Sequence, residues 1–162
     1  MHHSRFKTIR DMSTPVYTNP DQALIHRFMT QPDGSLSFDC NPMALALCTR
    51  ILSVDAAVGR IELGFDPDTL FIQGTGVLQG GAVTAMMDFA MAFALLAQLP
   101  PGQSCATVNL TSAFLRPAPK GRYKAIGELE RRGKALAFTQ ARLLREDDQV
   151  LVASATSTLA LL

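Results

Sequence analysis

The sequence has few of the side chains that hold metal ions or form nucleophilic triads. Its only histidines are His2, His3 and His26, all near the start of the chain. A catalytic triad or a histidine metal site needs an imidazole next to the other reacting groups. These three histidines are far in sequence from every other candidate residue, so we expect no triad and no metal.

Cysteine is equally scarce. Cys40, Cys48 and Cys105 are odd in number, widely spaced and without any C-x-x-C pair. This pattern indicates neither a disulfide framework nor a zinc site. We interpret the three as small, buried, apolar residues in a reducing compartment.

Residues 1–18 have no apolar run of the kind that a signal peptide needs, and they mix Pro15 with polar side chains. We predict a mobile N-terminal arm here and a cytoplasmic location. Residues 19–162 fit one domain, because most domains hold roughly 100 to 200 residues.

No charge of one sign dominates. The chain has 15 basic and 14 acidic residues and a net charge of +1, which disfavours nucleic acid and anionic membranes as partners. The hydrophobic fraction of 48% is high and predicts that surface is buried in a homo-oligomer. Charge is nevertheless uneven, because residues 116–145 hold nine basic residues against Glu128 and Glu130.

Apolar periodicity predicts one long helix among strands. We expect short helices at 24–29 and 43–47, a turn at 31–37, the long helix at 82–98, and strands at 51–55, 60–65, 104–115, 122–132, 135–145 and 150–161. The four strands after the helix are expected to be consecutive antiparallel neighbours. The predicted fold is α+β, with a sheet of about six strands that curls around the helix.

The long helix is apolar around nearly its whole circumference. Its run of about 17 residues is at the short limit for a membrane span, and it carries Asp88 near the middle. We therefore predict a helix buried in the core of the domain.

Asp88 is the only acidic residue between Asp68 and Glu128. Burying a lone carboxylate costs several kcal/mol, which calls for either a catalytic role or a structural pairing. At the start of the same helix, the Gly80-Gly81 pair offers free backbone N–H groups and the positive end of the helix dipole to a developing oxyanion. Glycine here is equally compatible with a plain helix cap.

Gly80 and Asp88 lie too far apart to act on one carbonyl within one chain. Eight residues at about 1.5 Å each separate them by about 12 Å along the axis, whereas catalytic groups must lie within roughly 3 Å of the reacting atoms. Two antiparallel helices in a two-fold dimer remove the difficulty. We predict two composite sites per dimer.

The segment Val77-Leu78-Gln79-Gly80-Gly81, with Asp88 at the seventh position after Gly81, resembles the signature of hotdog-fold thioesterases in the phenylacetate-degradation (PaaI-like) branch, in which H-G-G is followed by D at that spacing. The runs at 107–110 and 114–117 and the turn at 132–134 also resemble that family. The similarity extends from about residue 41 to 159 and implies a hotdog fold and hydrolysis of acyl-CoA thioesters.

The resemblance implies a role for each matching residue. Asp88 is expected to be the nucleophile or general base, and the Gly80 amide is expected to polarise the thioester carbonyl. Gln73 matches an Asn that helps to bind the carbonyl or water, and Thr107 matches a residue that orients the attacking water. Gln79 replaces the motif's His and can hydrogen-bond but not titrate. Gln73 and Thr107 are equally compatible with an ordinary loop amide and a strand hydroxyl.

The substrate contacts are expected at Gly81 and at three cations near turns. Arg116, Arg132 and Lys134 could bind the phosphates of coenzyme A, although cations on sheets also protect against edge pairing. We expect a dimer or a dimer of dimers that needs water and no cofactor beyond the coenzyme A of its substrate. The alternatives are a protein that binds acyl-CoA without hydrolysis, and a hotdog dehydratase, which would need a suitably placed His.

Overall fold

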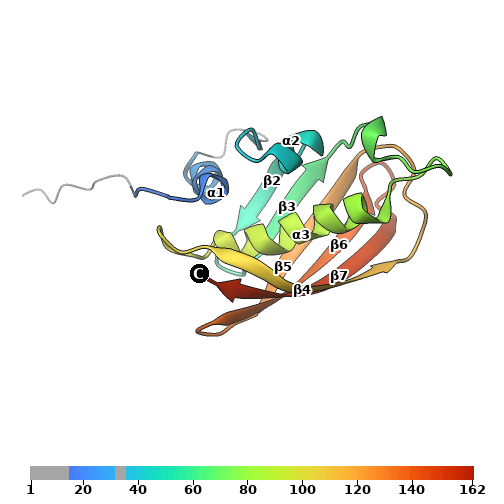
Figure 1. Cartoon of the computed structure of the whole chain (residues 1–162). Helices are drawn as coiled ribbons and strands as arrows, with labels where there is room; N and C mark the ends of the chain where they lie inside the picture. Colours follow the sequence, from blue (N-terminus) through green and yellow to red (C-terminus); the bar gives the residue numbers. More distant parts are fainter. Residues whose placement is uncertain (1–14, 32–35) are drawn as a thin grey trace, which may run out of the picture.

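Seven strands form one antiparallel sheet that curves around the long helix α3 (Figure 1). This computed structural model describes residues 15–31 and 36–162. The elements are α1 (Pro20–Thr30), β1 (Leu36–Ser37), α2 (Pro42–Ala46), β2 (Arg50–Asp55), β3 (Arg60–Phe65), the 3-10 turn η1 (Thr69–Phe71), α3 (Gly80–Leu96), β4 (Cys105–Phe114), β5 (Tyr123–Arg132), β6 (Leu136–Arg145) and β7 (Leu151–Leu161).

The expected α+β hotdog architecture is confirmed. The strand order is β1-β2-β3-β5-β6-β7-β4, and every neighbouring pair is antiparallel. The strand beyond the six predicted is β1, whose two residues pair with the start of β2. It occupies the end of the segment predicted as a turn, of which residues 32–35 lie outside the described part of the chain.

The prediction that the four strands after the helix are consecutive neighbours is wrong for the first of them. β4 pairs with β7 at the edge of the sheet, whereas β5 pairs with β3. The connection at 115–122 is longer than a tight hairpin turn, so it lets the chain cross from the edge of the sheet to its middle. The proline and glycine residues in this connection predict where a strand ends but not where the next one pairs.

Each of the first two helices begins directly after an asparagine cap, α1 at Pro20 and α2 at Pro42. The Asn19 side chain accepts a hydrogen bond from the Asp21 N–H at 2.9 Å, and Asn41 caps α2 in the same way. The fully buried Gln22 then donates to the Leu99 carbonyl at 2.9 Å and links α1 to the turn that follows α3.

Helix α3 lies against the sheet at very short range. A Cβ atom at Gly127 on β5 would overlap the carbonyl group of Ala90 on α3. Glycine therefore allows the helix to sit low on the strands, with its buried side chains pointing into the core. The largest fully buried side chains of that face are Met86, Met87, Met91 and Leu95.

One side of α3 is less covered than the sequence predicts. Gly81 is exposed and the rest of this stripe is only partly buried, so the single chain does not enclose the helix. The stripe consists of Gly81, Thr84, Ala85, Asp88, Phe89 and Ala92. No helix within residues 15–31 and 36–162 is both long enough and apolar enough to span a membrane.

The prediction that all three cysteines are buried is wrong for two of them. All three thiols are free, but Cys40 and Cys48 are exposed and only Cys105 is partly buried. Cys48 follows α2 in a turn with a positive φ of 49°, and Cys40 precedes the cap of α2. Both thiols lie in surface connections, where their apolar character does not place them in the core.

Candidate functional site

The chemistry-bearing residues meet where the uncovered stripe of α3 runs beside the edge strand β4. We call this line of contacts the α3–β4 seam. As the residue numbers increase along β4, the residue numbers of their contacts on α3 decrease, so the two segments run in opposite directions. The seam pairs Cys105 with Ala92, Thr107 with Asp88, Ser112 with Thr84, and Phe114 with Gly80.

Asp88 is oriented by a hydroxyl group. The Thr107 Oγ1 donates a hydrogen bond of 2.8 Å to Asp88 Oδ1. Asp88 is only partly buried, and no cation within the described part of the chain forms a salt bridge with it. The structural ion pair considered for this carboxylate is therefore absent there, and the predicted burial is incomplete in the single chain.

Cys105 lies at the same end of the seam, and its sequence gave no sign of a link to the site. Burial raises the pKa of its thiol to about 11, and the negative charge of Asp88 adds to the shift. The Cys105 Sγ lies 3.8 Å from the carbonyl oxygen of Ala92. At neutral pH this thiol stays protonated, so the group beside the Asp88 carboxylate is uncharged.

The other end of the seam is the start of α3. Gln79 occupies the cap position without any hydrogen bond from its side chain. Its carbonyl accepts from the N–H groups of Ala82 and Val83, while the N–H groups of Gly80 and Gly81 donate to nothing among the described residues. Two free amides at the positive end of a helix suit an oxygen that gains negative charge.

A pocket of about 370 Å³ opens onto Gly80. Val83 and Phe114 supply apolar walls and Arg116 lies at its rim. A Cβ atom at Gly80 would lie 3.3 Å from the Phe114 ring, so a side chain there would crowd the pocket. The pocket thus joins a free amide, apolar walls and a cation.

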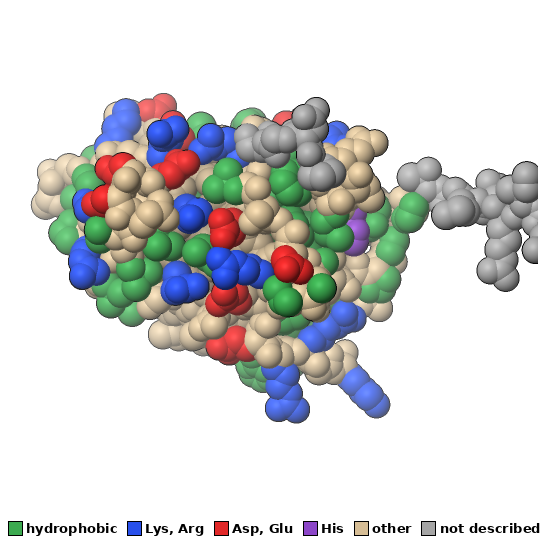
Figure 2. Space-filling model, turned by 180° about the vertical axis from the view of Figure 1, so that it is seen from behind, with side chains coloured by type: hydrophobic (Ala, Val, Ile, Leu, Met, Phe, Trp, Pro, Cys, Tyr) green, Lys and Arg blue, Asp and Glu red, His purple; other side chains and the backbone are tan. Residues whose placement is uncertain are grey.

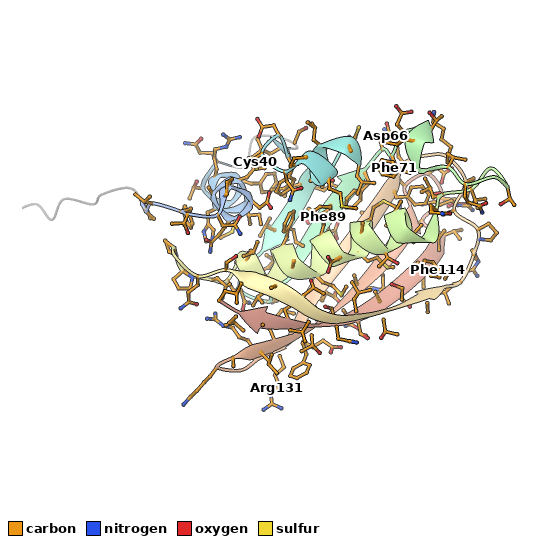
Figure 3. All side chains as sticks on the ribbon, in the orientation of Figure 1. Cys40, Asp66, Phe71, Phe89, Phe114 and Arg131 are labelled. Atoms are coloured by element: carbon orange, nitrogen blue, oxygen red, sulfur yellow. The ribbon has the colours of Figure 1, made fainter. Side chains whose placement is uncertain are left out.

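Phe114 is a site residue that the sequence analysis missed. Figure 3 shows its side chain at the end of β4, beside the first turn of α3, and it is 56% exposed. Simple alternation from Thr107 would place residue 113 on this face of the strand. A register shift between Thr107 and Asn109 moves residues 110, 112 and 114 there instead.

The two glutamines do not join these groups. The Gln73 amide folds over its own loop, donating to Thr75 Oγ1 at 2.7 Å and accepting from the Thr75 N–H at 2.9 Å. Gln79 is exposed. Neither side chain is hydrogen-bonded to Asp88 or Gly80 within the described part of the chain. The structure therefore pairs Asp88 with Thr107 but leaves Gln73 in its loop.

The three predicted phosphate contacts lie at opposite ends of α3. Arg116 is beside the start of the helix, where its guanidinium donates to the Leu151 carbonyl at 2.8 Å. Arg132 and Lys134 line a hollow of about 680 Å³ near the end of the helix, and Arg132 donates to the Gln98 carbonyl at 3.3 Å. One chain cannot bring all three to one ligand of modest length.

Several other cations in residues 116–145 take part in salt bridges. On the face of the sheet opposite α3, basic and acidic side chains alternate (Figure 2). Salt bridges within the strands join Lys124 with Glu62 and Arg142 with Glu128, and salt bridges at the ends of β5 and β6 join Arg122 with Glu146 and Arg145 with Asp148. Arg116, Arg132 and Lys134 form no salt bridge among the described residues, so their charges are not neutralised in that way.

Comparison with known proteins agrees with this arrangement. The family model of the thioesterase superfamily matches residues 75–152, which contain both ends of the seam. A phenylacetic acid degradation-related protein from Ralstonia eutropha JMP134 is 33% identical, with a TM-score of 0.72 over 85% of this chain and 98% of that one. No curated protein matches the chain.

Two further solved structures are similar. A thioesterase family protein from Silicibacter pomeroyi is 25% identical, with a TM-score of 0.72 over 87% of this chain and 96% of that one. The PaaI protein of the E. coli phenylacetic acid degradation operon has the same fold at 20% identity, with a TM-score of 0.70 over 86% and 92% of the two chains.

The fold, the seam and these similarities define the protein as a hotdog-fold member of the thioesterase superfamily. Within that superfamily the chain belongs to the PaaI-like branch. The general chemistry is thioester hydrolysis.

Proposed function

We propose that the protein hydrolyses acyl-CoA thioesters in sites that two subunits build together. The observation that carries this proposal is the division of the seam into two reactive ends. Asp88 with Thr107 forms one end, and the free Gly80 amide with its pocket forms the other. Both ends lie on one unbroken helix, about 12 Å apart along its axis.

A second copy of the chain would complete each site. If its α3 runs antiparallel to the first, the Asp88 end of one seam faces the Gly80 end of the other, twice per dimer. The edge strand β4 and the residue after it support this partner, because Val108, Phe114 and Leu115 are 63%, 56% and 50% exposed in one chain. Apolar side chains this exposed favour burial against another subunit. A further pairing of dimers into tetramers is compatible with the fold.

The proposed reaction begins with attack on the thioester carbonyl. Asp88 either attacks the carbon itself or removes a proton from an attacking water molecule that Thr107 helps to orient. The carbonyl oxygen gains negative charge and is stabilised by the Gly80 N–H, with Gly81 beside it. The carbon–sulfur bond then breaks, and coenzyme A leaves as a thiolate that takes up a proton. When water attacks, the free acid forms directly; when Asp88 attacks, a mixed anhydride forms on its carboxylate, and a water molecule hydrolyses it to release the free acid and restore Asp88. Gln79 can contribute a hydrogen bond but no proton transfer.

The same antiparallel arrangement suits coenzyme A as the leaving group. It brings Arg132 and Lys134, which lie at the end of one α3, toward Arg116 at the start of the partner's α3. Guanidinium and ammonium groups bind phosphate oxygens by charge-assisted hydrogen bonds. We also propose a cytoplasmic location, where the three free thiols would stay reduced.

A second candidate function is binding of acyl-CoA without hydrolysis. It is favoured by the position of Gln73, whose amide is engaged with Thr75 rather than with the reactive ends of the seam. Gln79, which cannot titrate, points the same way.

Thiol release from a panel of short-chain and aromatic acyl-CoAs separates the two functions. We expect turnover that the Asp88→Asn variant loses. If the wild-type protein binds acyl-CoA in calorimetry yet releases no thiol, the binding function is correct and the hydrolase is not.

A further inference from the structure

The middle of the α3–β4 seam holds a pair of hydroxyl groups with no role in the proposed reaction. Thr84 Oγ1 lies 3.2 Å from Ser112 Oγ, and the pair is partly buried. Thr84 is four residues from Gly80 and four from Asp88, so it lies about 6 Å along the axis from each reactive end. Two other residues of the uncovered stripe, Ala85 and Phe89, are apolar.

Symmetry gives this midpoint a special position. Suppose that a two-fold axis sets Asp88 opposite Gly80 of the partner subunit, as the proposed function requires. For any two residues that face each other across the two helices, the residue numbers then have the same sum as 80 and 88. Position 84 is half of that sum, so it faces position 84 of the partner subunit. We propose that Thr84 lies at the two-fold axis of the dimer, where its hydroxyl and that of Ser112 meet their counterparts in the partner subunit.

Such a contact would fix the register of the two helices. A hydroxyl that is buried without a partner is unfavourable, because it gives up its hydrogen bonds to water and gains none in return. Registers that set Thr84 against the apolar Ala85 or Phe89 would bury hydroxyls against methyl groups or a ring. In the register that places Thr84 at the two-fold axis, the hydroxyls of Thr84 and Ser112 from both subunits come together. Each of these four hydroxyls can both donate and accept a hydrogen bond. A polar residue in an apolar coiled-coil seam selects one alignment in the same way.

Spin-label distances in the full-length chain test the position of the axis. Cys40, Cys48 and Cys105 are replaced by alanine, and a single cysteine is labelled in the Thr84→Cys or the Ala92→Cys variant. Ala92 is the matched control because it lies on the same stripe. The two labels at position 84 should be the closest pair. The two labels at position 92 should be separated by about 24 Å along the direction of the helices, because each lies eight residues from position 84.

A label at Thr84 could itself push the subunits apart, which sedimentation would reveal. The Gly81→Cys and Ala92→Cys variants then locate the axis without it, because their label pairs should be offset by about 9 Å and about 24 Å along the helix. Label pairs at position 84 that are as far apart as those at 92 overturn the inference, and so does the absence of any coupled spins.

This experiment does not depend on turnover, although the inference rests on the proposed function. A short label distance at position 84 in a protein that releases no thiol would contradict the proposed hydrolysis and support the position of Thr84 at the two-fold axis. Thiol release together with a long distance at position 84 would keep the hydrolase and overturn the register.

Discussion

At the scale of single residues, the environment of Asp88 decides what it can do. Its sequence context predicts a lone acid buried in an apolar helix. In the structure, Asp88 accepts a hydrogen bond from the Thr107 hydroxyl and is partly exposed to solvent. A carboxylate that accepts a hydrogen bond from a hydroxyl and forms no salt bridge with residues 15–31 or 36–162 is available to attack a carbonyl or to accept a proton.

Replacing Asp88 by Asn should lower the rate of thioester hydrolysis at least about a hundredfold, because an amide supplies neither a nucleophile nor a base. The Asn side chain has the same size, so the dimer should persist. Steady-state thiol release reports the rate, and size-exclusion chromatography serves as the control for assembly. Turnover close to that of the wild type would exclude Asp88 from the mechanism.

Cys105 provides a probe of the charge on Asp88. Because burial and Asp88 together raise the pKa of this thiol to about 11, alkylation by iodoacetamide should be slow near neutral pH and should speed up as the pH rises toward that pKa. The Asp88→Asn substitution removes a negative charge that disfavours the thiolate, so the pKa of Cys105 should fall.

The measurement is the alkylation rate against pH in a chain whose exposed Cys40 and Cys48 are replaced by serine. An unchanged profile in the Asp88→Asn variant would show that the two groups do not interact.

At the scale of helices and strands, the site depends on how closely α3 sits on β5. The seam keeps its spacing only if the helix stays low on the sheet, and Gly127 is the residue that allows this approach.

Gly127→Ala should lower the free energy of unfolding by about 1–3 kcal/mol or more, because its methyl group would overlap the Ala90 carbonyl. Urea denaturation measures the change. Gly121→Ala is the matched control, since a Cβ atom there meets nothing within 4 Å. Equal stability of the two variants would contradict the close packing of α3 on β5.

The sequence predicts where the helices and strands lie better than it predicts which strands pair. Period-two alternation and Gly, Asn and Pro signals locate the strands and helix starts, because these are local effects. The pairing of β4 with β7 is not local, since it depends on which strand edge is free after β5 has paired with β3. The same limit hid Phe114, which a bulge in β4 turns toward Gly80.

The site is predicted only in part for a similar reason. Asp88 stands out in sequence because charged residues are seldom placed in an apolar helix, and Gly80 gains its meaning from its spacing to Asp88. Gln73 matches a family position, yet its amide is used up by Thr75 within the loop. A side chain's choice between its own loop and a site depends on three-dimensional distances that spacing alone does not supply.

At the scale of the whole molecule, one chain carries two half-sites that cannot meet. Figure 1 shows α3 as one unbroken helix along the sheet. Gly80 is its first residue, and Asp88 lies at its middle. The exposed apolar side chains of β4 and the uncovered stripe of α3 lie next to each other along the seam. A partner subunit placed there would cover both and complete two sites at once.

Subunit complementation tests this central claim most directly. Asp88→Asn and Gly80→Pro chains are each expected to be inactive, and proline suits the first position of a helix while removing its N–H. In a heterodimer, the Asp88 of one chain and the Gly80 of the other form one intact site. A control mixture of Asp88→Asn with Asp88→Ala chains has no intact site in any dimer.

With random exchange, half of the dimers are mixed and each holds one good site, so the mixture should recover about a quarter of the wild-type activity. The control mixture should stay inactive. No recovery in a mixture whose subunits demonstrably exchange would contradict a site shared between two chains.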